Sequence, residues 1–227
     1  MMSNRKYDTK KLVTISLLTA LAFGIMVVGR FSLIPAAAFL KYDAKDVVIA
    51  VGGFLYGPLT SLMMSAAVSF LEMITVSESG IIGCVMNIIS TVSFTCTAAF
   101  IYKKNKTLTG AVMGLLSGVF LCTVVMLLWN YLLVPIYTPF ITREAVMGML
   151  LPVFLPFNLL KGGLNAALTM LLYKPLRAAL DRSKLLPIKI ENSGEKPSVR
   201  INIWTYIISF FVLASCVLIV LSMFGII

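Results

Sequence analysis

Residues 151–173 read LPVFLPFNLLKGGLNAALTMLLY, an apolar run with a lysine near its centre. A helix needs roughly 20 apolar residues to cross the hydrocarbon core of a bilayer, so Leu151–Tyr173 is long enough to span it. Lys161 lies deep in this run, and a central lysine costs about 2.5–3.5 kcal/mol on insertion scales. The stretch therefore predicts a membrane span that carries a functional side chain.

Further apolar runs account for most of the chain, over Leu12–Ile34, Ile81–Tyr102, Leu108–Val134 and Ile203–Ile227. Of the 227 residues, 59% are hydrophobic and 12% are charged, and the mean hydropathy is +0.99. The charged share is about half of that in soluble domains. This composition excludes a soluble enzyme domain and a disordered chain.

Residues 46–75 form one more apolar stretch, and Gly57-Pro58 interrupts it as either a kink or a turn between two passes. Charge favours the turn. Fourteen of the 19 Lys and Arg residues cluster at residues 5–11, 103–106 and 174–200, and all three clusters are cytoplasmic only if residues 46–75 cross twice. We therefore predict seven spans, with the N-terminus inside and the C-terminus outside. Topology then explains most of the net charge of +10, and no nucleic-acid partner is required.

The first pass of this pair is short. Asp46–Tyr56 would form roughly 16 Å of helix, less than the ~30 Å of hydrocarbon. The preceding segment, Phe31–Ala44, is then expected to dip into the protein, because irregular backbone at membrane depth needs protein or a cavity around it. A short helix beside an apolar loop indicates a binding site. A short tilted helix with a surface loop fits the same sequence.

Polar residues inside the spans are the candidate site. Asn158 and Asn165 lie three residues before and four residues after Lys161, so the three share one helical face. Asn130 and Asn87 lie in two other spans. Donors and acceptors on one face could hold a planar polar ligand, while hydrogen bonds between helices are the alternative for Asn87 and Asn165. The aromatic residues Phe39, Tyr42, Trp129 and Phe157 could contact such a ligand or form the interfacial belt.

Other charged residues in these regions look ordinary. Glu72 lies near the outer end of its span and is expected to be close to water. Of the five basic residues outside the three clusters, only Lys161 is expected to lie deep in a span.

Several kinds of chemistry are absent from the sequence. There is no histidine, the four cysteines form no C-x-x-C pair, and there is no Gly-x-x-x-x-Gly-Lys-Ser/Thr phosphate loop. We therefore predict no catalytic residue and no metal site, and any ATP-driven role requires partner subunits.

Small residues repeat at four-residue spacing in two spans, which lets helix backbones approach closely. Gly110, Gly114 and Gly118 are expected to pack within the chain. Ala20 and Gly24 could equally dock a partner subunit.

Five motifs occur in order along the chain. They are Phe39-Leu-Lys41-Tyr42-Asp43-Ala-Lys45-Asp46, Tyr56-Gly-Pro58, Ser77-Glu-Ser-Gly80, Asn130-Tyr131 with Pro135-Ile-Tyr137, and Leu155-Pro-Phe-Asn158-Leu-Leu-Lys161-Gly162. Together, over about residues 10–180, they resemble the riboflavin-specific substrate-binding (S) subunits of energy-coupling factor (ECF) transporters.

The resemblance implies a six-helix S-component bundle that binds riboflavin from outside the cell. It also implies docking on a membrane coupling (T) subunit with two cytoplasmic ATPases, which use ATP to release the vitamin inside the bacterial cell. No cofactor is implied for this chain. The implied flavin contacts are Asn130, Asn158 and Lys161, and the loop that caps the site contains Phe39, Lys41, Tyr42 and Asp43. In span one, Ala20 and Gly24 are the implied contacts with the coupling subunit. Asn87 is a further candidate for ligand binding.

The chain departs from this family in two places. A polar Glu-x-x-Lys-Asn stretch of the family reads Ser65, Val68 and Ser69 here, which admits a flavin analogue or another vitamin. The family core ends near Leu180. We therefore expect a vitamin-binding membrane domain over 1–180, a polar cytoplasmic linker over 181–200 and an additional span over 201–227.

A stand-alone secondary transporter is an alternative. It would need ion-coupling carboxylates or histidines in the membrane, and Glu72 is the only acidic residue within an apolar span. A purely structural membrane protein would leave Lys161 unexplained, and an intramembrane enzyme would lack acid–base groups.

Overall fold

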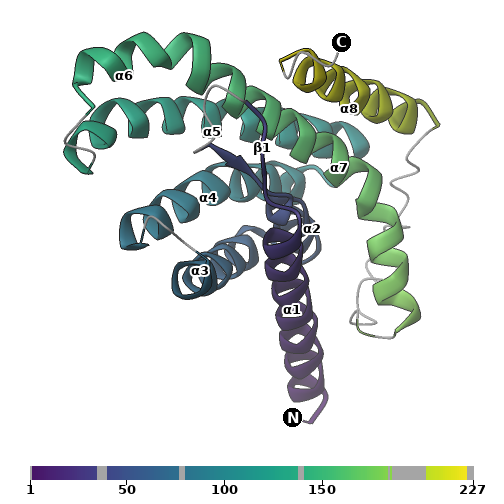
Figure 1. The fold of residues 1–227 in the computed structure, drawn as a ribbon. Coiled ribbons are helices and arrows are strands. Elements are labelled where there is room, and N and C mark those ends of the chain that lie inside the picture. The colour runs from purple at the N-terminus through teal and green to yellow at the C-terminus, as the bar shows by residue number, and fades with distance from the viewer. Residues whose placement is uncertain are drawn as a thin grey trace.

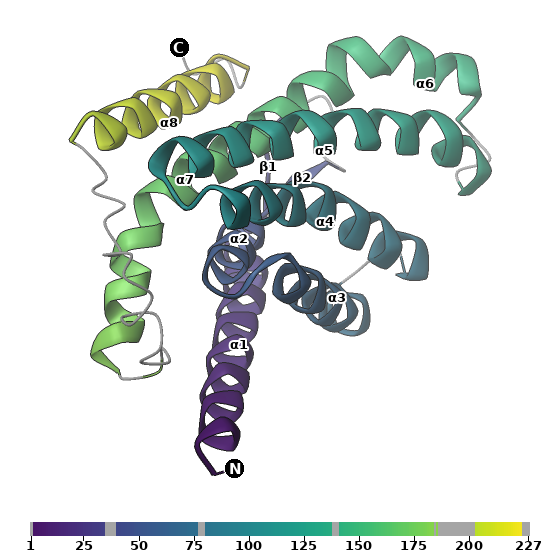
Figure 2. The same ribbon diagram turned by 180° about the vertical axis from the view of Figure 1, so that it is seen from behind.

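A computed structural model describes residues 2–34, 40–76, 80–137, 141–183, 185 and 203–223. In chain order the elements are α1 (Met2–Val28), β1 (Phe31–Ser32), β2 (Lys41–Tyr42), α2 (Lys45–Tyr56), α3 (Pro58–Thr75), α4 (Gly80–Lys104), α5 (Leu108–Tyr137), α6 (Arg143–Met149), the π-helical turn η2 (Leu150–Phe154), α7 (Leu155–Arg182) and α8 (Ile203–Met223). The helices form a bundle (Figures 1 and 2). The chain is an all-α integral membrane protein, with one small strand pair.

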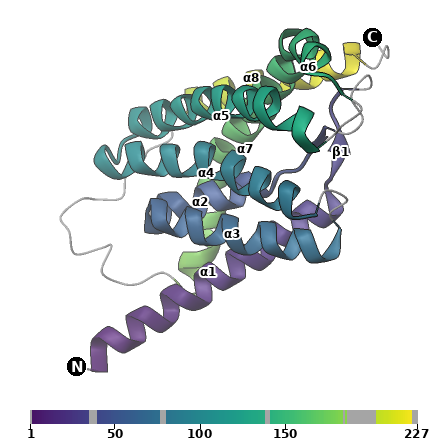
Figure 3. The same ribbon diagram turned by 90° about the vertical axis from the view of Figure 1, so that its left-hand side faces the viewer.

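The long helices run back and forth between two ends of the bundle. In the described part of the chain, six helices are long and apolar enough to cross a membrane, and α2, at 12 residues, is shorter than these. Figure 3 shows the start of α1 at one end, and β1, α6 and the end of α8 at the other. This arrangement agrees with an odd number of passes, of which α2 is the short one.

The first helix ends earlier than the sequence suggests. The apolar run was expected to be helical as far as Ile34, but α1 ends at Val28 and the chain turns into β1. Phe31 pairs with Tyr42 and Ser32 pairs with Lys41 in an antiparallel register. Hydropathy could not locate the end of α1, because the apolar residues that follow it are buried too. Ile34, for example, has an exposed fraction of 2%, although it lies beyond the helix. We call residues 31–34 and 40–43 the hairpin segment.

The stretch over residues 46–75 contains two helices that meet at a sharp turn, as predicted. Gly57 has a φ of 99°, which favours glycine, and Pro58 begins α3 at a position that needs no backbone N–H. Past the turn the helices run side by side, and the Ser61 hydroxyl donates to the Ile49 carbonyl oxygen at 3.4 Å. The chain therefore reverses at Gly57. The first residues of α2, Lys45 and Asp46, are buried, so this helix begins inside the protein.

The glycine stripe of α5 packs within the chain, as expected. A methyl group on Gly114 would lie 2.7 Å from the carbonyl oxygen of Ala98, and one on Gly118 would lie 2.5 Å from that of Phe94. Both distances are too short for a real side chain, so α4 and α5 touch backbone to backbone. Around this contact lies the larger hydrophobic core, which includes Phe94, Ala98 and Leu115.

The predicted span over Leu151–Tyr173 is part of a longer helical stretch. It begins with α6, passes through η2 and continues as α7 to Arg182. Pro152 and Pro156 lack the N–H groups for regular helical bonds, and the Leu155 N–H instead reaches the carbonyl oxygen of Leu150. The additional span appears as α8. Most of the predicted linker over 181–200 and residues 224–227 lie outside the described residues, and the division into three parts stays a prediction.

Candidate functional site

One cavity collects the polar residues that the sequence singled out. It lies next to the hairpin segment, and α3, α4, α5 and α7 supply its other walls. Six predicted site residues line it: Lys41, Asp43, Asn87, Asn130, Asn158 and Lys161. Arg30, Leu40, Glu72, Met86, Met126 and Phe157 also line it. Residues that lie more than one hundred positions apart in the chain therefore face one volume.

Lys161 has a buried carboxylate partner on another helix. Its ammonium nitrogen lies 3.7 Å from Oδ2 of Asp46, at the start of α2. Both residues are buried, with exposed fractions of 9% and 2%. The Thr91 hydroxyl donates to the other oxygen of Asp46 at 2.7 Å. Asp46 therefore joins α2, α4 and α7, and it neutralises a charge that would otherwise be costly at this depth.

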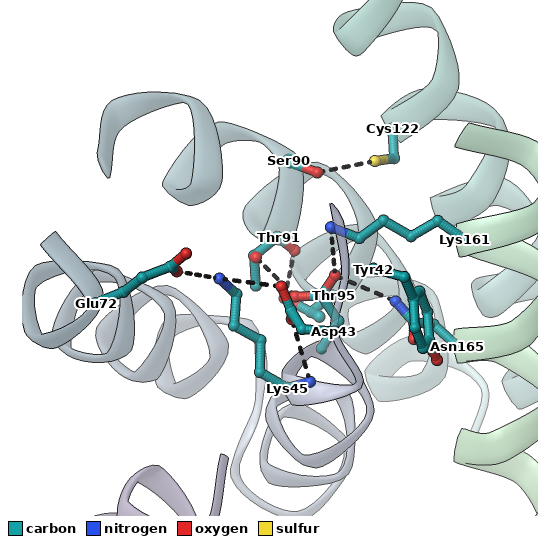
Figure 4. A network of polar contacts seen from close by, with 11 residues as sticks. Tyr42, Asp43, Lys45, Glu72, Ser90, Thr91, Thr95, Cys122, Lys161 and Asn165 are labelled. Atoms are coloured by element: carbon teal, nitrogen blue, oxygen red, sulfur yellow. Dashed lines mark hydrogen bonds and ion pairs between the residues drawn. The ribbon is translucent and has the colours of Figure 1, made fainter. Parts of the chain in front are cut away.

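A chain of hydrogen bonds continues from Asp46 to the hairpin segment. The Asn165 amide nitrogen donates to Oδ2 of Asp46 at 3.2 Å, and the Tyr42 hydroxyl donates to Oδ1 of Asn165 at 2.9 Å. Figure 4 shows Tyr42, Asn165 and Lys161 grouped at this junction. Burial, with the charge of Asp46, raises the pKa of Tyr42, so its hydroxyl stays protonated and donates. Asn165 on α7 thus forms hydrogen bonds to β2 and to α2, which agrees with the alternative that it connects elements of the fold rather than binding a ligand.

Tyr42 therefore takes a different place from the one expected. Its side chain is buried, and its hydroxyl is directed to Asn165 rather than toward the cavity. Its ring packs edge-on against Phe31, with centroids 5.3 Å apart. Tyr42 thus supports the wall of the cavity and is not part of the lining. Phe39, the other aromatic residue proposed for the cap, lies outside the described residues.

A second buried ion network lies on the α3 side of the cavity. The Lys45 ammonium is 2.5 Å from Oε2 of Glu72 and 3.7 Å from Oδ2 of Asp43, and Arg30 is 3.5 Å from Oε1 of Glu72. Glu72 is 1% exposed, so the expectation that it lies close to water is wrong. Lys45 is also 1% exposed, so Lys161 is not the only deep lysine. The short helix α2 explains both errors, because it begins at depth and brings Lys45 there.

The charges of the two networks balance. Arg30, Lys45 and Lys161 provide three cations, and Asp43, Asp46 and Glu72 provide three carboxylates. Burial by itself would raise the pKa of Asp43, but the charges of Lys45 and Lys161 lower it below its ordinary value, so Asp43 stays ionised. Buried charges are tolerated when they are paired in this way. The two networks are therefore charged in their parts and neutral in sum.

The two asparagines on the far wall present acceptors. The Asn130 amide nitrogen donates to the Met126 carbonyl oxygen, and that of Asn158 donates to the Phe154 carbonyl oxygen, each at 2.7 Å. Within the described part of the chain, neither amide oxygen accepts a hydrogen bond. Each residue thus has its orientation fixed by its own helix and keeps an oxygen for a ligand.

Asn87 and the remaining polar positions differ from these two. Asn87 is half-buried at the cavity on α4. Ser65 and Ser69 are buried on α3, and their hydroxyl oxygens find no partner among the described residues. Trp129 packs against the main core rather than lining the cavity. Phe157 is the aromatic residue that does line it.

Sequence reasoning missed Asp46, Lys45 and Glu72 as members of the site. Two signals could have found them. A buried lysine such as Lys161 requires an acidic partner, and few carboxylates are available in this chain. A helix as short as α2 must also start inside the membrane, so the charged residues at its first turn are buried by geometry.

The surface of α1 carries the predicted partner contacts. Ala20 and Gly24 are both exposed, and nothing lies within 4 Å of the position of a side chain on Gly24. The neighbouring residues Leu17, Leu21 and Val27 on α1 are also exposed. This small-residue face is therefore not used for packing within the described part of the chain.

Comparison with known proteins agrees with this architecture. The riboflavin transporter FmnP of Bacillus subtilis is 30% identical over 183 residues, which are 77% of this chain and 96% of that protein. The riboflavin transporter RibU of Streptococcus thermophilus is 31% identical over 181 residues, or 76% and 85% of the two chains. A solved structure of the S component of a bacterial ECF transporter is 28% identical, with a TM-score of 0.64 over 76% of this chain and 98% of that one.

The family assignment covers the whole region that contains the cavity. The model of the ECF transporter substrate-specific component matches residues 10–173, from α1 to most of α7. It includes every lining residue of the cavity and excludes α8. A protein of this family is a transporter component and not an enzyme. The chain therefore belongs to the family of ECF transporter substrate-specific components.

Proposed function

We propose that this chain is the S subunit that captures riboflavin, or a close flavin, outside the bacterial cell and delivers it inward with an ATP-driven coupling module. One observation carries the proposal. Asn130 on α5 and Asn158 and Lys161 on α7 come from two separate motifs, and they line a single cavity together with Lys41 and Asp43 from a third motif. The two riboflavin transporters that are 30% and 31% identical support the identity of the ligand.

The chemistry of the cavity suits a flavin. The isoalloxazine ring has carbonyl acceptors, which the ammonium of Lys161 can bind, and the ribityl hydroxyls can donate to the amide oxygens of Asn130 and Asn158. Phe157 and Met126 offer apolar and polarisable surface to the ring. Riboflavin is uncharged, and this agrees with a site in which the six charges of the two networks are already paired.

Delivery is proposed to follow the family. The exposed face of α1 around Ala20 and Gly24 would dock on the T subunit, and two cytoplasmic ATPases would supply the energy. Small residues at four-residue spacing allow another helix to approach closely. The cell membrane and a cytoplasmic N-terminus follow from the positive-inside pattern and belong to the same proposal.

A fluorescence titration tests the ligand. Adding purified protein to riboflavin should quench the flavin fluorescence in the nanomolar range and saturate at one flavin per chain. Competition with flavin analogues and with unrelated vitamins would then rank the ligands. Absence of quenching at micromolar protein would overturn riboflavin as the ligand.

One observation favours a second candidate, a stand-alone secondary transporter. Asp43, Asp46 and Glu72 are buried carboxylates, the type of group that couples transport to ions. All three are paired with cations of this chain. Proteoliposomes that contain this chain alone distinguish the two functions. Riboflavin uptake driven by a proton or sodium gradient would favour the secondary transporter.

A further inference from the structure

The additional helix α8 packs on the bundle by one narrow stripe. It lies beside α7 in Figures 1 and 2. Its buried and half-buried residues alternate at intervals of three and four, and include Tyr206, Ser209, Leu213, Cys216 and Val220. This is the spacing of a seam between two helices that pack along their length. The opposite side, with Phe211 and Leu218, is exposed.

The outer half of this stripe contacts the elements that build the ligand cavity. Leu213, Cys216 and Val220 share a hydrophobic cluster with the hairpin segment and α7. From the hairpin segment and α7 the cluster includes Leu33, Ile34, Leu40, Tyr42, Phe157, Leu160 and Leu164. A methyl group on Gly163 would lie 3.4 Å from the Cys216 sulfur, so α8 rests directly on α7 at this point.

Two cluster members face the cavity on their other side. Leu40 and Phe157 belong to the cluster that α8 covers, and both also line the cavity. Tyr42, a third member, holds Asn165 and through it Asp46. The hydrophobic cluster that α8 packs against therefore extends to the wall of the ligand cavity.

We propose that α8 is a brace that holds the hairpin segment against α7 and so slows ligand release. The proposal rests on the proposed function. The hairpin segment has two paired residues in each strand, and one hydrogen bond from Tyr42 to Asn165 ties it to α7, so apolar packing must hold Leu33, Ile34 and Leu40 in place. Lipid tails could replace α8 without a loss of hydrophobic free energy, but they pack loosely and do not order their neighbours. Loss of the brace should therefore loosen the hairpin segment without unfolding the bundle.

The release rate of riboflavin tests the brace. In the full chain, Leu213→Ala with Val220→Ala removes the packing, and stopped-flow fluorescence measures association and dissociation. We expect dissociation to accelerate at least about threefold while association changes little, since interface changes act mostly on the off-rate. The number of sites per chain should stay constant. Leu213→Met with Val220→Ile refills the space and should restore slow release.

The exposed side of α8 supplies the matched control. Phe211→Ala with Leu218→Ala removes two large side chains that are 70% and 55% exposed. This variant should release riboflavin at the wild-type rate. Equal rates in the stripe variant and wild type would overturn the brace and leave the proposed function intact. A loss of binding sites with an unchanged off-rate would also overturn it, because α8 would then serve folding alone.

Hydrogen–deuterium exchange keeps the test valid if wild-type protein binds no riboflavin. Amides of residues 31–34 and 40–42 should then exchange faster in the stripe variant than in the exposed-side control. Equal exchange in the two variants would overturn the brace. Failure of riboflavin binding in wild-type protein would by itself overturn only the identity of the ligand.

Discussion

The ammonium nitrogen of Lys161 on α7 lies 3.7 Å from Oδ2 of Asp46 on α2, and both residues are buried. This pair joins α7, which carries the predicted ligand contacts Asn158 and Lys161, to the short helix α2, which follows the hairpin segment. Breaking a buried pair by removing one partner typically destabilises a protein by about 3–5 kcal/mol, whereas replacing both partners with apolar residues is often neutral. That asymmetry separates the role of the pair in folding from its role in binding.

We expect Lys161→Ala and Asn158→Ala each to weaken riboflavin binding by more than about tenfold, which is about 1.4 kcal/mol. Each change removes a polar group from the cavity. Fluorescence quenching measures the affinity. Lys104→Ala, an exposed residue at the far end of α4, is the control and should bind as wild type does. Unchanged affinity in both cavity variants would refute this site.

Asp46 is expected to act on the ligand through Lys161. Asp46→Asn should weaken binding in the wild-type background but have little further effect beside Lys161→Met, because coupled residues are not additive. The double variant should also unfold at a higher temperature than either single variant, since neither charge is left alone. Affinity and thermal unfolding of the four proteins check both statements. If the effects of Asp46→Asn and Lys161→Met on the binding free energy were fully additive, Asp46 would not position Lys161.

Glu72→Gln should strongly destabilise the protein. Glu72 pairs with Lys45 and Arg30, and its loss leaves the two networks with three cations against two carboxylates. The expected loss is about 3–5 kcal/mol, the usual range for a broken buried pair. Glu144→Gln on exposed α6 is the control and should change little. Thermal unfolding in detergent compares them, and equal midpoints would contradict the buried network.

Gly118→Ala should destabilise the contact between α4 and α5. The new methyl group would meet the Phe94 carbonyl oxygen at 2.5 Å, so the backbones must separate. Overpacking of this kind costs about 1–3 kcal/mol. Gly148→Ala is the matched control, because nothing lies within 4 Å of its new methyl group. A melting temperature unaffected by Gly118→Ala would show that α4 and α5 lie further apart than in this structure.

Gly24→Trp should prevent assembly with the T subunit and leave riboflavin binding unchanged. The position is open in this chain and lies on α1, away from the residues that line the cavity. Phe120→Trp, at a residue that is 71% exposed on α5, provides a control for a bulky residue in the bilayer. Co-purification from membranes that contain all subunits measures assembly. Normal assembly of the Gly24 variant would rule out this face.

Much of the fold was readable from local sequence. Long apolar runs located α4, α5, α7 and α8, and the positive clusters required a reversal at Gly57-Pro58. The end of α1 was not readable, because hydropathy reports burial and does not tell burial in lipid from burial in protein. Leu33 and Ile34 of the hairpin segment are buried in protein, so they continue the apolar signal of the span before them.

For the site, the sequence by itself determined which side chains are unusual for their depth: Lys161, Asn158 and Asn130 stand out because a membrane makes isolated polar groups costly. Only the tertiary structure decided what balances them. Asp46, Lys45 and Glu72 lie at the ends of helices, where sequence alone cannot separate a surface charge from a buried one. Pairing energy depends on distance in space, and the packing of α2 against α3, α4 and α7 sets those distances.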